Sequence, residues 1–277
     1  MDKYINKIIN GDNVKILKQF QENSIDLSIQ SPPYSNLRDY TNEKEWNWAG
    51  FTEIAKELYR VTKVGGICVW VVGDKTINCS ETLDSFRQAI YFKDECKFLI
   101  HDTMIYEKTG TPYPSKNKYY QNFEYMFILS KGKPNIINLI KDKPNSNAGK
   151  PAHWGKITYR QKDGSLKEMG ENYITPEFGV RTNIWKYKTG GNNVTVDKIA
   201  YKHPAIFPEK LAEDHIKSWS NEGNLVLDVF GGSGTTMKIA HKLNRKFIYI
   251  DMGIEYCEIA SQRFKENFNQ EIEIVKI

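Results

Sequence analysis

Short apolar runs alternate with amphipathic stretches along the first 130 residues. The runs at residues 24–30 and 65–74 have the length and apolar content of buried strands. The stretch between them, residues 48–66, repeats apolar side chains at the helical period and is predicted to end at Gly65-Gly66. Its apolar positions are Phe51, Ile54, Ala55, Leu58 and Val61. The order strand, helix, strand indicates an α/β fold.

The same alternation continues to the end of the chain, with one interruption. A second helix is predicted over residues 81–98, followed by strands over 99–108 and 123–132. After residue 203 the pattern predicts a helix, a strand leading through a glycine-rich turn into a helix, a strand and a last helix, at 203–220, 224–243, 245–252 and 253–268. This rhythm predicts a mostly parallel sheet with helices on both faces.

Residues 131–202 are the interruption. They are rich in Lys, Asn and Gly and show no long periodic pattern. We interpret them as an irregular insertion and not as a disordered tail, because they contain many aromatic residues. The chain is therefore divided into residues 1–130, the insertion and residues 203–277, with the first and last parts forming one domain. A length of 277 residues suits this organisation.

The positive charge is concentrated in the insertion. The whole chain carries a net charge of +5, whereas residues 131–202 hold 14 Lys or Arg against 6 Asp or Glu, a net charge of +8. A basic segment on a nearly neutral body suits a polyanionic partner such as nucleic acid. A solvated, lysine-rich surface explains the same charge equally well.

Other classes of protein fit the chain poorly. The longest apolar run, residues 67–72, is too short to span a bilayer, and the opening residues lack the apolar core of a signal peptide. We therefore expect a cytoplasmic protein without a membrane partner. The four cysteines are scattered, with no paired spacing, so neither a metal site nor a disulfide framework is expected.

A glycine-rich turn follows the predicted strand at 225–228. Three glycines let the backbone approach a ligand closely, and the next strand ends at Asp251, 23 residues after Asp228. An acid at that position can accept hydrogen bonds from ribose hydroxyls. Asp228 would repel a pyrophosphate but could orient an ammonium group, and Met237 stands where a dinucleotide fingerprint wants a small residue. Both points favour S-adenosylmethionine over NAD.

The motif Ser31-Pro32-Pro33-Tyr34 follows the first predicted strand. Two prolines stiffen the chain and contribute no N–H donors, so the carbonyls of Ser31 and Pro32 are left with few local partners. An exocyclic amine could donate to these acceptors while Tyr34 stacks on its ring, as for a base extruded from a duplex. A rigid loop that packs Tyr34 into the core is the alternative, but ligands in open α/β sheets bind at this end of a strand.

Three segments together resemble the β class of amino DNA methyltransferases. They are residues 9–34, the stretch "EYMFILSKG" and residues 203–264, which lie toward both ends of the chain and cover about a third of it. The resemblance implies a Rossmann-like, S-adenosylmethionine-dependent fold in which the catalytic half precedes the cofactor half. It also implies that the insertion at 131–202 is a target-recognition region for double-stranded DNA.

The resemblance further implies roles for individual residues. The residues expected to bind the cofactor are Asp12, Phe207, Asp228, Phe230, Gly232, Gly234, Thr235 and Asp251. Asp12 would reach the adenine edge or simply cap a helix, and Phe207 would close over the methionine end or lie in the core. Ser31 and the Pro32 carbonyl would accept hydrogen bonds from the target amine, and Tyr34 would stack on the flipped base. Which aromatic of residues 113–127 contacts the base stays open.

The choice of base depends on Ser31. In the family that Ser31-Pro32-Pro33-Tyr34 resembles, a serine at this position goes mostly with cytosine N4 methylation and an aspartate with adenine N6. We therefore favour cytosine N4, with adenine N6 as the alternative. A catalytically inactive nucleic-acid-binding protein, or an enzyme acting on RNA or a protein amine, is a weaker alternative. A cognate restriction endonuclease and a homodimer are further partners to be considered.

Overall fold

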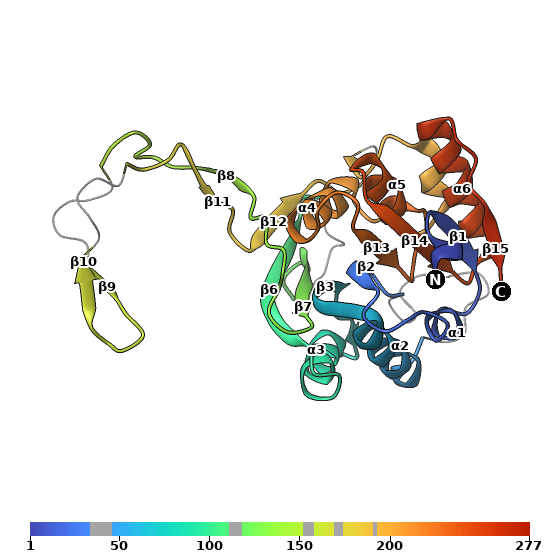
Figure 1. Cartoon of the computed structure of the whole chain (residues 1–277), viewed down its shortest axis with the longest axis horizontal. Helices are drawn as coiled ribbons and strands as arrows, with labels where there is room; N and C mark the ends of the chain where they lie inside the picture. The colour runs from blue at the N-terminus through green and yellow to red at the C-terminus, as the bar shows by residue number, and fades with distance from the viewer. Residues whose placement is uncertain (34–45, 111–117, 152–157, 169–173, 191–192) are drawn as a thin grey trace. The chain divides into compact units, whose positions relative to one another are not determined.

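The computed structural model describes residues 1–33, 46–110, 118–151, 158–168, 174–190 and 193–277 (Figure 1). They form two compact units, which we call the main unit and the second unit. The main unit joins Met1–Asn138 with Asn183–Ile277, and the second unit is Leu139–Thr182. Among the helices in these ranges, none is long and apolar enough to cross a membrane.

The described part of the main unit is built on a nine-stranded sheet with the order β12-β6-β7-β3-β2-β13-β14-β1-β15. Strand β7 is antiparallel to its neighbours β3 and β6, and the other neighbouring pairs are parallel. The prediction of a mostly parallel sheet is therefore confirmed. In chain order the strands are β1 Lys7–Asn10, β2 Ile25–Gln30, β3 Thr62–Val72, β6 Leu99–Lys108, β7 Phe123–Ser130, β12 Ile184–Tyr187, β13 Leu225–Asp228, β14 Lys246–Asp251 and β15 Ile274–Lys276.

Helices cover both faces of this sheet, as predicted. Helices α1, α2 and α3 lie on one side of it, and α4, α5 and α6 lie on the other (Figure 1). Apolar side chains of the first three helices join those of the strands in one buried core. The helices are α1 Asn13–Leu17, α2 Trp48–Val61, α3 Asp84–Asp94, α4 Glu209–Trp219, α5 Thr235–Lys242 and α6 Ile254–Phe268, with short 3-10 turns at Asp2–Tyr4 and Lys198–Lys202. A small hairpin, β4 Thr76–Ile77 with β5 Ser80–Glu81, follows β3.

Helix α2 shows why the sequence pattern was informative and where it failed. Its five predicted apolar positions are all buried, and the Asn47 side chain caps its start by accepting from the Gly50 N–H at 3.0 Å. The helix ends at Val61, so the prediction that it continues to Gly65-Gly66 is wrong. Both glycines lie inside β3, where the register with β2 shifts and Gly65 has φ +81°. They accommodate an irregular strand, which a helix-ending glycine pair resembles in sequence.

The second unit is narrower than the predicted insertion. It contains two antiparallel two-stranded sheets, β8 Lys141–Pro144 with β11 Phe178–Val180 and the hairpin β9 Thr158–Arg160 with β10 Leu166–Glu168. The side chains of β8, β9 and β10 are exposed. Strand β12, which lies inside the predicted range 131–202, instead pairs with β6 in the main sheet. The stretch from Asn183 onward therefore belongs to the main unit.

The order of the central strands positions the functional residues. Strand β13 pairs in parallel with β2 on one side and β14 on the other. The carboxyl ends of these strands therefore meet at one edge of the sheet, the usual ligand-binding edge of an open α/β fold. This edge brings together Ser31, Asp228 and Asp251, although they lie far apart in the sequence.

Candidate active site

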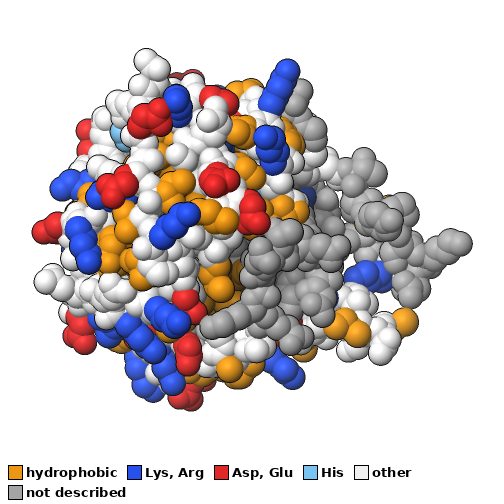
Figure 2. Space-filling view, turned by 90° about the vertical axis from the view of Figure 1, so that its right-hand side faces the viewer, with side chains coloured by type: hydrophobic (Ala, Val, Ile, Leu, Met, Phe, Trp, Pro, Cys, Tyr) orange, Lys and Arg blue, Asp and Glu red, His pale blue; other side chains and the backbone are white. Residues whose placement is uncertain are grey.

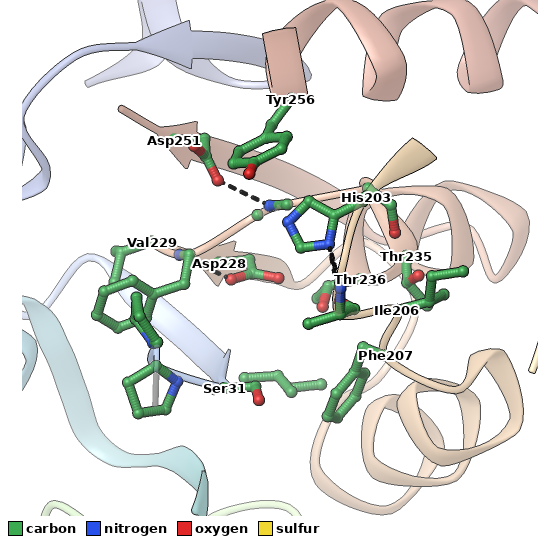
Figure 3. A pocket seen from close by; sticks show the side chains of 18 of the residues that line it. Ser31, His203, Ile206, Phe207, Asp228, Val229, Thr235, Thr236, Asp251 and Tyr256 are labelled. Atoms are coloured by element: carbon green, nitrogen blue, oxygen red, sulfur yellow. Dashed lines mark hydrogen bonds between the residues drawn. The ribbon is translucent and has the colours of Figure 1, made fainter. Parts of the chain in front are cut away.

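A cavity of about 900 Å³ opens at this edge of the main unit. Most of the predicted site residues line it, and they come from both ends of the chain (Figure 3). Asp228, Asp251 and Tyr256 lie toward one side of the site, and Ser31 and Phe207 lie together toward the other (Figure 3). The predicted residues in the lining are Asp12, Ser31, Pro32, Pro33, Phe207, Asp228, Phe230, Gly232, Thr235 and Asp251.

The glycine turn between β13 and α5 approaches the cavity at one glycine and packs against a helix at another. Gly232 lines the cavity with φ +48°, and a Cβ built on it would lie 2.9 Å from the His203 ring. Gly234 has φ +77°, and its Cβ would lie 2.9 Å from Ala260 of α6. Gly234 is not part of the cavity lining. Position 234 requires glycine because Ala260 of α6 packs closely against the start of α5. Position 232 requires glycine because a side chain there would meet the His203 ring beside the cavity.

Asp228, the last residue of β13, is a buried carboxylate at the cavity wall. Its Oδ1 accepts a hydrogen bond from the Phe230 N–H at 3.0 Å. Burial raises the pKa of Asp228 to about 7, and hydrogen bonds from Thr236 and Phe230 oppose this rise. A positively charged ligand group beside Asp228 would favour the ionised form.

Asp251, the last residue of β14, ties the glycine turn to the following helix. Its Oδ2 accepts from the Gly232 N–H and its Oδ1 from the Gly253 N–H, both at 2.8 Å. Burial raises the pKa of Asp251 to about 6, against the effect of these two hydrogen bonds. Each oxygen of the Asp251 carboxylate has a second lone pair, so it can still accept a hydrogen bond from a ribose hydroxyl.

Ser31, Pro32 and Pro33 lie directly after β2 and line the same cavity. Tyr34 lies outside the described residues. The end of β2 is fixed by Gln30, whose Oε1 accepts from the Val229 N–H at 3.0 Å and whose Nε2 donates to the Leu227 carbonyl at 3.2 Å. Gln30 therefore holds the proline motif beside the end of β13. Sequence reasoning missed it, although a glutamine at the end of an apolar strand was a visible signal.

Two predicted residues had open alternatives. The Asp12 side chain caps α1 by accepting from the Lys15 N–H at 3.0 Å, and Asp12 also lines the cavity, so both expectations are compatible. Phe207 lies in the segment that leads into α4 and lines the cavity. Phe207 is therefore not a core residue without contact with the cavity, which was the alternative expectation.

Several lining residues were not predicted. His203 packs its ring against Tyr256 with 4.4 Å between centroids, and its Nδ1 accepts from the Ala205 N–H at 3.1 Å. On the opposite side of the site, Lys108 of β6 forms an ion pair with Glu124 of β7. The family-like segment "HPAIFP" contained His203 as a signal, but no sequence pattern linked Lys108 to Glu124.

A buried ion network lies behind the glycine turn. Arg263 of α6 is fully buried and pairs with Asp197 at 2.6 Å and Glu209 at 2.7 Å. Its guanidinium also donates to the Ser233 carbonyl and to the Thr235 hydroxyl, both at 2.9 Å. These bonds connect the glycine turn to α6 and to the segment that precedes α4, so the wall of the cavity is fixed from behind.

Parallel strands that deliver two acids and a glycine turn to one cavity define a nucleoside-cofactor enzyme of the α/β type. The model of the family described as DNA methylase, which covers N6-adenine and N4-cytosine enzymes, matches residues 25–262. The chain belongs to this family. The predicted family, the fold and the S-adenosylmethionine cofactor are thereby confirmed.

Individual relatives agree with this assignment. The chain is 56% identical over 242 residues to the orphan methyltransferase M.BamHII of Bacillus amyloliquefaciens, covering 87% of this chain and 89% of the relative. It is 29% identical over 269 residues to the Type II methyltransferase M.HpaI of Haemophilus parainfluenzae, covering 95% and 75%.

Solved structures share the fold. The PvuII DNA methyltransferase, described as cytosine-N4-specific, aligns with a TM-score of 0.68 at 22% identity, over 93% of this chain and 85% of that one. The complex of M1.HpyAVI with S-adenosylmethionine aligns with a TM-score of 0.59 at 22% identity, over 93% and 98%.

The cavity suits S-adenosylmethionine chemically. The cofactor carries a sulfonium and an ammonium group, and buried carboxylates such as Asp228 are stabilised in their ionised form by a nearby positive charge. Its carboxylate suits the start of α5, where Thr235 lines the cavity and the helix dipole is positive. Asp251 lines the same cavity, and its carboxylate would accept hydrogen bonds from ribose hydroxyls if the cofactor binds there.

Proposed function

We propose that this site-specific DNA methyltransferase modifies the N4 amine of cytosine. The observation that carries the proposal is the placement of Ser31, a neutral hydroxyl, in the cavity lining at the carboxyl end of β2. A similar fold is found in the PvuII enzyme, which is described as cytosine-N4-specific. The serine at the first position of the motif favours the same base.

The chain's own contribution to the chemistry is alignment and electrostatics. The lone pair of an exocyclic amine is delocalised into the ring, so the amine is a poor nucleophile. Acceptors on both of its hydrogens, the Ser31 hydroxyl and the Pro32 carbonyl, favour a tetrahedral nitrogen and stabilise the positive charge that grows on it. S-adenosylmethionine supplies a methyl group already activated by the sulfonium. The chain therefore needs to hold the amine in line with that methyl group.

The prolines make this arrangement rigid. Pro32 and Pro33 have fixed φ angles and no N–H groups, so the acceptors after β2 do not need to reorganise when the amine arrives. Tyr34 is proposed to stack on the flipped base. The proton leaves the nitrogen after transfer, so the site requires no strong general base.

We propose double-stranded DNA as the substrate and the basic residues 131–202, including the second unit, as the target-recognition region. On the face of the molecule shown in Figure 2, Lys and Arg side chains are interspersed with Asp and Glu among the described residues. The net charge of +8 in residues 131–202 supports an attraction of this segment to DNA phosphates. The cognate endonuclease and the homodimer stay predictions.

Purified enzyme tests the choice of base. Unmethylated genomic DNA is incubated with the enzyme and S-adenosylmethionine, then digested to nucleosides and analysed by mass spectrometry, while sequencing of the same DNA gives the recognition sequence. We expect N4-methylcytosine at one sequence. N6-methyladenine alone would refute the cytosine assignment. In parallel incubations with RNA or with protein, methylation of either without methylation of DNA would refute the choice of substrate.

A further inference from the structure

Lys108 and Glu124 form an ion pair inside the cavity that the proposed chemistry does not use. The two residues lie on neighbouring antiparallel strands, and Tyr106, the register partner of Glu124, lines the cavity with them. Among the described residues that line the cavity, Lys108 is the one lysine or arginine. A single cation in a cavity lined by five acids points to a role in binding a ligand.

The pair is held in a defined position. The Lys108 ammonium contacts the Glu124 carboxylate and lies 5.7 Å from the centre of the Tyr106 ring. The side chain of Glu124 is only 14% exposed, and that of Lys108 is 32% exposed. Burial and the nearby Glu124 carboxylate raise the pKa of Tyr106, so its hydroxyl stays protonated. A lysine ammonium group has three N–H donors, so Lys108 can present donors to the cavity in addition to the one directed at Glu124.

Ser31 and the Lys108–Glu124 pair line the same cavity from different strands of the sheet. In the sheet order, β7 with Glu124 lies two strands from β2, and β6 with Lys108 lies three strands from it, which corresponds to about 10 Å and about 14 Å between the backbones. The space between Ser31 and the pair is therefore on the scale of a nucleobase. Gly73, which directly follows β3, lies beside Glu124, and a Cβ on it would be 3.3 Å from the Glu124 side chain. The glycine therefore leaves room for the Glu124 side chain.

We propose that Lys108, positioned by Glu124, is a specificity-determining residue that donates hydrogen bonds to the ring acceptors of the flipped base. This inference rests on the proposed role of Ser31 in holding the amine. Cytosine and adenine both carry a ring nitrogen acceptor next to the carbon that bears the amine. On the Watson–Crick edge, where cytosine and adenine carry this acceptor, guanine and thymine carry a ring N–H. That N–H would face the donors of Lys108 and leave both groups unpaired. Lys108 thus selects amino bases with an acceptor edge.

The test compares Lys108→Met with Lys63→Met. Lys63 forms a similar pair with Asp26, at 2.7 Å on the neighbouring strands β3 and β2, but lies outside the cavity lining and outside residues 131–202. With a duplex carrying the recognition sequence, we expect Lys108→Met to lower kcat/KM roughly 10- to 100-fold, the loss typical of a charged hydrogen bond to a buried acceptor. Lys63→Met should stay within twofold of the wild type, and the Kd for S-adenosylmethionine should be unchanged in both.

A third variant and a second duplex distinguish a contact with the base from a contact with phosphate. Lys108→Gln keeps N–H donors without the charge and should recover part of the activity, and it also serves if Lys108→Met does not fold. The second duplex lacks only the target base and keeps its phosphates. If Lys108→Met weakens binding to this abasic duplex as much as to the intact one, Lys108 contacts phosphate and the proposal is wrong.

An unchanged kcat/KM in Lys108→Met would also overturn the proposal. The identity of the methylated base is read separately, by nucleoside analysis of the wild-type product. Finding N6-methyladenine would refute the cytosine assignment while leaving the Lys108 comparison intact, because both bases offer the ring nitrogen.

Discussion

The two sides of the cavity are made rigid in different ways. On the β13–β14 side, the backbone is fixed by hydrogen bonds: Asp251 accepts from two backbone N–H groups, and Arg263 holds the glycine turn from behind. On the β2 side, Pro32 and Pro33 fix the backbone covalently and supply no N–H groups. We call the β13–β14 side the proposed cofactor side and the β2 side the proposed target side. The proposed cofactor side is stiffened by internal hydrogen bonds, whereas the proposed target side would keep carbonyl acceptors available for a substrate amine.

The largest expected effect breaks the target side alone. Ser31→Ala should lower kcat roughly 100- to 1000-fold, because one acceptor that stabilises the developing charge is removed. The Kd for S-adenosylmethionine, measured by calorimetry, should change less than twofold. Ser28→Ala is the matched control, since Ser28 is a buried serine of β2 outside the cavity lining. A weakened cofactor Kd in Ser31→Ala would contradict the separation of the two sides.

The next effect breaks the support behind the cofactor side. Arg263→Met should lower the free energy of unfolding by about 3–5 kcal/mol, because Asp197 and Glu209 would remain buried with less compensating charge. Chemical denaturation measures this change. The control is Lys265→Met on the same helix, which removes an exposed pair with Glu271 and should cost less than about 1 kcal/mol. If Arg263→Met lowers the free energy of unfolding as little as Lys265→Met does, the buried network does not stabilise the fold.

Asp228→Asn should separate cofactor affinity from stability. Removing the charge should weaken the binding of S-adenosylmethionine roughly 10- to 100-fold, because a buried charged partner is lost. The free enzyme should become more stable at pH 8, since a pKa raised to about 7 by folding means that ionisation opposes the folded state. Calorimetry and thermal unfolding measure the two changes. A destabilised Asp228→Asn at pH 8 would argue against this account.

The smallest effect is a pH dependence confined to the cofactor side. A group whose pKa is raised in the fold contributes stability below its unfolded pKa and loses it as the pH rises through the folded value. For Asp228 this window runs from about 4 to about 7. A cationic ligand prefers the ionised form, so the affinity for S-adenosylmethionine should rise about 10-fold between pH 6 and pH 8. Asp228→Asn should flatten this profile.

The sequence pointed to the cavity residues of the β13–β14 side more directly than to Lys108 and Glu124, for a physical reason. Asp228, the glycines and Asp251 lie within one strand–helix–strand unit, so their spacing in the sequence fixes their proximity. Lys108 and Glu124 meet only because β6 and β7 pair in one antiparallel register, which no local pattern specifies. This pair is therefore brought together by tertiary structure alone.

The fold itself shows the same limit. The long amphipathic helix α2 and the buried central strands follow from periodicity, since burial of one face decides both. Strand β12 was missed within the irregular segment 131–202, because it is short and only alternate side chains are buried. Gly65-Gly66 was assigned to a helix end because glycines commonly end helices. In the structure the pair instead lies at a register shift in β3. Neither ambiguity is removed without the neighbouring strands.

The reversed direction of β7 has a consequence for how such an enzyme can diversify. Because β6 leaves the sheet and β7 enters it at the cavity edge, the connection at residues 109–122 begins and ends beside the cavity. A parallel strand in place of β7 would require a crossover to the opposite edge. If the target base binds as proposed, changes in the length or composition of this connection would alter its surroundings while the sheet register stays the same. It is an attractive place to exchange sequence between relatives when altered substrate preference is the aim.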